Sequence, residues 1–114
     1  MLTGQEIHDV LKQQWAEAKS SGFLQISGLR YTYTNSPPYV IDLRDDSGKE
    51  IDKTAFYPVT VSSYLADGED NFTKFKGKSP RELNLSDFIV LVNYVSKLPH
   101  PFTRDIDKRI IKLD

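Results

Sequence analysis

Apolar and polar residues alternate with a helical period at the start of the chain. Five apolar residues recur at helical spacing and form one stripe: Ile7, Val10, Leu11, Trp15 and Ala18. This spacing is typical of a helix that places one face on a core. Thr3 and Glu6 stand three residues apart, as in a capping box, and Gly22 suits the position after a helix end. The pattern therefore predicts a helix between Thr3 and Gly22, with Trp15 packed inward.

The apolar period shortens to two residues beyond this helix. Leu24 and Ile26, and then the run from 29 to 33, predict one or two strands with a break at Gly28. The second run places Leu29, Tyr31 and Tyr33 on one face, and Arg30, Thr32 and Thr34 on the other. Further strands are predicted over 39–43, 56–63 and 109–113, and turns over 35–38 and 45–48. The 56–63 strand is expected to be central, although Pro58 assigns part of it to an edge or a strand start.

A second long helix is predicted over residues 86–98. Its apolar residues spread over a broad face, so it is expected to be well buried: Phe88, Ile89, Leu91, Val92 and Val95. A further capping signal stands earlier, at residues 79–82. The order of elements, a helix, four strands, a loop, a helix and a strand, predicts an α+β fold. We expect one domain with a mixed or antiparallel sheet and two main helices packed on it.

Composition narrows the classes of function. The chain has 114 residues, enough for a single domain over 1–114. Its formal net charge of −1 argues against nucleic acid as a partner, and no apolar run is long enough to span a membrane. The absence of cysteine excludes disulfides and thiolate metal sites without fixing a compartment. No signal peptide is visible after Met1.

The sequence offers no catalytic constellation. His8 and His100 have no neighbouring ligands at the spacings that metal sites need, and both are interpreted as surface or loop histidines. The stretch 68–71 lacks the lysine and hydroxyl residues of a phosphate-binding loop. No serine or threonine has a recognisable base partner. We therefore expect no catalytic residue and no metal site in this chain, and no hydrolysis of nucleotides by the chain alone.

Two motifs carry a resemblance to a known family. The run FLQISGLRY over residues 23–31 and the run YLADGEDNF over residues 64–72 together resemble the C-terminal domain of the 5′-nucleotidase family. That family includes UDP-sugar hydrolases and 2′,3′-cyclic-nucleotide phosphodiesterases. The leading LTGQEIHDVL resembles the helix before the first motif, and residues 108–110 resemble the family's closing strand. The resemblance thus covers nearly the whole chain.

The resemblance implies a substrate-binding site. Phe23 and Phe72 match the two phenylalanines that clamp a nucleobase in the family, and such stacking contributes roughly 1–3 kcal/mol per aromatic ring. Gly28 and Gly68 would give the flat ligand backbone clearance, and Asp70 would fix its own loop rather than touch substrate. The alternative interpretation is that both phenylalanines fill the core. The partner that the resemblance implies for the domain is a nucleotide or nucleoside.

The second motif departs from the family pattern at two positions. Glu69 and Asn71 stand where the family has glycine. Asparagine tolerates left-handed backbone geometry, whereas a left-handed glutamate costs roughly 1–2 kcal/mol. The loop is therefore expected to be reshaped around Glu69.

The resemblance also implies a larger parent protein. Family enzymes carry a metallophosphoesterase domain with a pair of divalent metals, zinc, manganese or similar, before this domain. The chain is thus interpreted as an N-terminally truncated domain without that catalytic half, from a secreted, periplasmic or cell-surface parent. The alternative is a non-catalytic binding or interaction domain that kept the fold and lost nucleotide binding.

Overall fold

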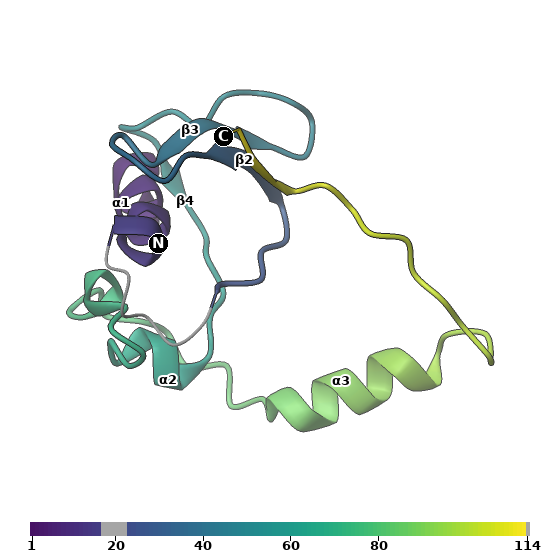
Figure 1. The fold of residues 1–114 in the computed structure, drawn as a ribbon. Helices are drawn as coiled ribbons and strands as arrows, with labels where there is room; N and C mark the ends of the chain where they lie inside the picture. Colours follow the sequence, from purple (N-terminus) through teal and green to yellow (C-terminus); the bar gives the residue numbers. More distant parts are fainter. Residues whose placement is uncertain (17–22, 114) are drawn as a thin grey trace.

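The structure is a computed structural model that describes residues 1–16 and 23–113, and it confirms the α+β class. Figure 1 shows α1 beside a small sheet at one side, and α3 apart from both. In chain order the elements are β1 (Leu2–Thr3), α1 (Gly4–Ala16), β2 (Leu29–Tyr33), β3 (Val40–Asp45), β4 (Phe56–Tyr57), α2 (Ser63–Ala66), the 3-10 helix η1 (Thr73–Phe75), α3 (Asp87–Ser96) and β5 (Ile110–Lys112). The strands are thus short, and long segments outside the sheets join them.

Helix α1 begins at the predicted capping box. Thr3 Oγ1 accepts a hydrogen bond from the Glu6 backbone N–H at 3.1 Å, and Glu6 Oε2 accepts one from the Thr3 N–H at 2.8 Å. The hydrogen bond that the Lys78 ammonium donates to Glu6 is the main cause that lowers the pKa of this carboxyl, and the two side chains also form an ion pair. The predicted apolar stripe of α1 faces the core, and its residues Ile7, Val10 and Leu11 are buried there. The expected helix end, with Ala18 and Gly22, lies outside the described residues.

The main sheet has three strands in the order β3–β2–β5. Strand β2 lies in the centre, antiparallel to β3 and parallel to β5, so the sheet is mixed. The turn at 35–38 joins β2 to β3, and Tyr33 pairs with Val40 across it. The predicted alternation along β2 is confirmed, because Tyr31 is buried and Arg30 is exposed.

One core unites α1, the main sheet and the two-stranded sheet of β1 and β4. Its buried apolar residues are Leu2, Ile7, Val10, Leu11, Tyr31, Val40, Leu43, Ile51, Phe72 and Phe75. Trp15 packs against this cluster as a partly buried side chain, as predicted. The core therefore draws almost entirely on the first three quarters of the chain.

Two of the predicted strands are wrong. Residues 24–26 form no strand, and the expected central strand over 56–63 is reduced to β4, which pairs only with β1. Pro58 follows β4 directly and has no backbone N–H to donate, which agrees with the end of pairing at that point. Ser63, the expected end of that strand, instead begins the short helix α2.

Helix α3 lies where the sequence predicts a helix, but its predicted burial is wrong. Ser86 Oγ caps its first turn, and no helix begins at the earlier signal over 79–82. Phe88 is 68% exposed and Leu91 is 58% exposed, because no described element covers either face of the helix. Figure 1 shows α3 at a distance from α1 and the main sheet. None of the described helices is long and apolar enough to cross a membrane.

Candidate functional site

Phe23 ends a stack of three aromatic rings from three different segments. The rings of Trp15 on α1 and Tyr33 on β2 lie 3.7 Å apart between centroids, with 12° between their planes. The Phe23 ring continues the stack 5.0 Å from Trp15 at 28°. Phe23 is 64% exposed, so much of its ring is open to solvent. An exposed aromatic face, supported from behind by a second ring, is a suitable platform for a flat ligand.

Buried hydrogen bonds hold the segment that carries Phe23. The Tyr31 hydroxyl accepts from Gln14 Nε2 at 2.7 Å and from Trp15 Nε1 at 3.0 Å. Gln14 Oε1 accepts from the backbone N–H of Leu24 at 2.9 Å, one residue beyond Phe23. Gln14 and Tyr31 are both almost fully buried. These bonds join α1, β2 and the Phe23 segment, and they fix the ring that Phe23 stacks on.

Burial raises the pKa of Tyr31 to about 12. The folded chain thus keeps the Tyr31 proton that the unfolded chain loses near pH 10, so this stabilisation is complete below pH 10 and disappears as the pH rises through about 12. In an alkaline titration followed by tyrosinate absorbance, we expect one tyrosine to ionise near pH 12 rather than near pH 10, or only when the chain unfolds. Tyr31→Phe should remove that late step, and its persistence in the variant would assign it to another tyrosine.

Phe72 does not lie where the clamp hypothesis expects it. It is 2% exposed and belongs to the core, so the prediction of partial exposure is wrong. Its ring contacts Phe75, with centroids 6.4 Å apart, and no ring contact joins it to Phe23 in the described part of the chain. The sequence hides this burial, because polar and glycine residues surround Phe72 on both sides. The role of Phe72 as a substrate contact remains a prediction.

The loop before Phe72 has left-handed geometry at Asn71, as the sequence allows, but not at Glu69. Gly68 has φ +85°, Asp70 +53° and Asn71 +65°, while Glu69 avoids positive φ. The strain predicted at Glu69 is therefore wrong, and Asp70 is the residue that carries it. The Tyr64 hydroxyl donates to Asp70 Oδ1 at 3.3 Å, which agrees with a role for Asp70 inside its own loop.

The two predicted glycines differ in their surroundings. Gly28 has φ +83°, and a Cβ built there would meet no atom within 4 Å. A Cβ at Gly68 would touch Lys76 and Thr73 at ordinary contact distances. Open space thus adjoins Gly28 rather than Gly68, and backbone clearance for a ligand remains a prediction at both.

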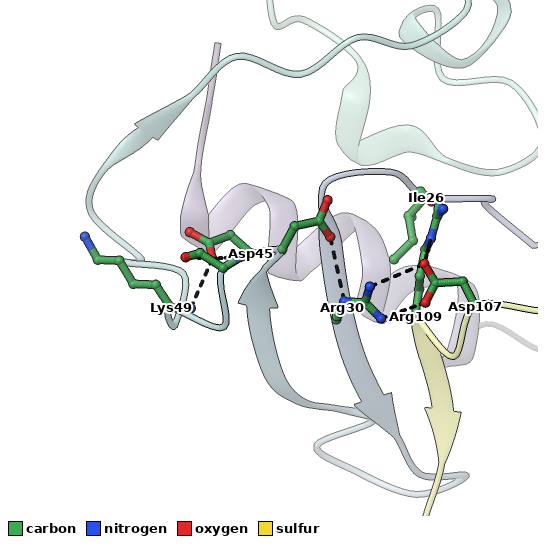
Figure 2. Close-up of polar contacts among 8 residues, drawn as sticks. Ile26, Arg30, Asp45, Lys49, Asp107 and Arg109 are labelled. Carbon is green, nitrogen blue, oxygen red and sulfur yellow. Dashed lines mark hydrogen bonds and ion pairs between the residues drawn. The ribbon is translucent and has the colours of Figure 1, made fainter.

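Charged side chains near the Phe23 segment are already paired. Asp107 accepts from Arg30 Nη1 at 2.7 Å and from Arg109 Nε at 3.0 Å, and Arg109 also donates to the Ile26 carbonyl at 2.7 Å. Figure 2 shows both guanidinium groups directed at the one carboxylate. The hydrogen bond from Arg30 is the main cause that lowers the pKa of Asp107. The cluster therefore joins β2 to β5 and offers little free charge to a phosphate.

The structure also has an apolar cavity that none of the three stacked rings lines. Its volume is about 330 Å³, and it is lined by side chains of α1 and by residues 24–27 and 59–62. Neither Phe23 nor Phe72 lines it. The alternating apolar residues of the two segments were the signal for it, but the sequence interpretation assigned them to strands. Residues 1–16 and 23–113 hold no group of three metal-ligating side chains.

The chain belongs to the 5′-nucleotidase C-terminal domain family, whose family model matches residues 1–77. This match confirms the resemblance carried by the two motifs.

Particular relatives include two mosquito proteins named apyrase. The one from Aedes aegypti is 36% identical over 110 residues, covering 85% of this chain and 20% of its own length. The one from Aedes albopictus is 33% identical, with 80% and 17% covered. Cell wall protein Lmo0130 of Listeria monocytogenes is 29% identical, with 82% and 12% covered. The chain thus spans a fifth or less of these relatives, and no solved structure matches it.

Proposed function

We propose that this chain is the nucleotide-binding domain of a 5′-nucleotidase-type phosphohydrolase, with Phe23 as the platform for the base. The carrying observation is the exposed Phe23 ring, stacked on Trp15 within the first family motif. A base has two π faces, and stacking on an aromatic ring tolerates several bases. The resemblance, rather than the fold alone, supports the choice of ligand.

Catalysis in this proposal belongs to a linked domain. A pair of divalent metals there would activate water and stabilise the phosphoryl group, while this domain holds the base and ribose. The described residues contribute orientation only. The names of the relatives, two apyrases and a cell wall protein, support a secreted or cell-surface parent.

Phe72 enters the proposal in a different role from Phe23. Because its ring is buried, it supports the loop of residues 68–71 from within the core. It can stack on a base only if that loop leaves the core first. The proposal therefore assigns direct stacking to Phe23, and it keeps Phe72 as the second clamp residue only in an open form of the loop.

A nucleoside titration tests the proposal. Adenosine is added to the chain and followed by Trp15 fluorescence, since the indole lies behind the proposed platform. Phe23→Ala should weaken binding by roughly 1–3 kcal/mol, a loss of about 5- to 150-fold, with little change in melting temperature. Phe23→Tyr should retain binding because it keeps the π face. Phe56→Ala is the matched control, because Phe56 is 67% exposed and outside the stack.

The same titration separates a second candidate function. Burial of Phe72 removes one half of the expected clamp and favours an interaction domain that no longer binds nucleotides. Wild-type chain that shows no response to adenosine or uridine at millimolar concentration would reject the nucleotide-binding proposal in favour of this one.

A further inference from the structure

Two walls of the apolar cavity in the core are formed by chain that belongs to no helix or strand. Residues 24–27 form one wall and residues 59–62 another, and the third comes from the buried stripe of α1 with Leu2 of β1. Every side chain in the lining is uncharged. A charged or strongly polar ligand would lose hydration there without gaining a partner, so the cavity suits an apolar occupant.

The backbone along this cavity has free hydrogen-bonding capacity. Within the described chain, the N–H and C=O groups of Val59, Thr60 and Val61 form no hydrogen bond with other protein groups. The backbone groups of Gln25 and Ser27, on the other wall, likewise form no hydrogen bond with the described chain. Extended main chain with unpaired N–H and C=O groups is a template for the addition of another strand.

The pairing of β1 with β4 sets the register that an added strand would follow. Leu2 lies opposite Tyr57 and Thr3 lies opposite Phe56, in antiparallel orientation. If the ladder continued past Tyr57 in the same register, Met1 would lie opposite Pro58, and an added strand would lie opposite residues 59–61 along the cavity wall. A strand placed there would extend an existing two-stranded sheet.

We infer that this cavity binds an extended peptide strand, antiparallel to residues 59–61, with apolar side chains at alternate positions. Successive side chains of a strand point to opposite faces, so one set enters the apolar cavity while the backbone pairs with the edge. An acyl chain would fill the cavity but leave the edge unpaired. A helix such as α3 would also leave it unpaired, because its own N–H groups are used internally. The site is distinct from the Phe23 platform.

Amide hydrogen exchange of the full chain tests this inference. The probe is a blocked nine-residue peptide of alternating valine and threonine with a lysine at each end. At saturation it should slow exchange at Val59, Thr60 and Val61 at least about tenfold. The same peptide with N-methylated valines and threonines keeps its side chains, loses its N–H donors and should give no protection.

Two matched variants distinguish peptide binding at the cavity from nonspecific binding to exposed apolar surface. Val59→Asp places a charge in the cavity wall, and Val92→Asp places one on α3; the two valines are 39% and 46% exposed, so neither change should unfold the chain. Only Val59→Asp should weaken peptide binding, at least about tenfold. Equal binding by both variants, equal protection by the N-methylated peptide, or no protection at all would overturn the inference. Protection without peptide in a dimeric chain would assign the edge to a second copy instead.

Discussion

Replacing Phe72 with alanine is expected to lower the free energy of unfolding by roughly 3–5 kcal/mol, because it deletes a large ring from a packed core. Phe72 is 2% exposed and contacts Phe75 in the same cluster. The loss is of the same order as the whole stability of many small domains, so the variant should melt far below wild type or fail to fold. Urea unfolding followed by circular dichroism measures the effect.

The control for this variant is the same substitution at the other motif phenylalanine. Phe23 is 64% exposed, so Phe23→Ala should change the unfolding free energy by less than about 1 kcal/mol. The two substitutions remove identical atoms and differ only in their surroundings. A small loss for Phe72→Ala, comparable to that for Phe23→Ala, would contradict the burial of Phe72 and restore the two-ring clamp as a single site.

Tyr31→Phe is expected to be the second most destabilising change. It removes the hydroxyl that accepts hydrogen bonds from Gln14 Nε2 and Trp15 Nε1 and leaves the ring in place. Depriving a buried donor of its acceptor costs roughly 1–3 kcal/mol, and two donors are affected here. Trp15 should also lose its fixed position behind Phe23, so nucleoside binding should weaken in the fraction that remains folded. Thermal unfolding and the adenosine titration measure the two effects.

Tyr33→Phe provides the comparison. Tyr33 lies two residues along the same strand and stacks on Trp15, but its hydroxyl makes no hydrogen bond within residues 1–16 and 23–113. Its removal should therefore leave both stability and nucleoside binding nearly unchanged. If Tyr33→Phe were as harmful as Tyr31→Phe, the loss in Tyr31→Phe could not be assigned to its hydrogen bonds with Gln14 and Trp15.

Features that depend on neighbouring residues could be predicted from the sequence. The capping box of Thr3 and Glu6 is local, and so is the alternation along β2, and both are present as predicted. The two motifs likewise placed the chain in its family. In each of these cases a few consecutive residues contain all the information that the feature needs.

Features that depend on a distant partner could not be predicted in the same way. Whether residues 58–62 form a strand is decided by the chain beside them, and no described segment pairs with them. A broad apolar face usually means that a helix is buried, but nothing in the described structure covers this face of α3. Phe72 is the opposite case, since its polar neighbours conceal a contact with Phe75 and the core.

The aromatic stack could be predicted only in part. Trp15 was placed inward by the helical period, and Phe23 was singled out by the family motif, but nothing in either pattern indicates that the two rings touch. Gln14 shows the difficulty most clearly. As a polar residue beside the apolar stripe it reads as a solvent-exposed position, yet it is buried because Tyr31 and Leu24 satisfy its amide.

The order of the main sheet has a consequence for synthesis of the chain. Strand β2 has β3 on one side, a few residues later in sequence, and β5 on the other, with Tyr31 opposite Ile110. At about 5–20 residues per second a ribosome needs roughly 4–16 seconds between making the two partners. During that interval the nascent hairpin of β2 and β3 has one uncovered side, and chaperones or neighbouring nascent chains can reach it. Translation speed over residues 34–109 therefore sets how long the unfinished sheet stays vulnerable.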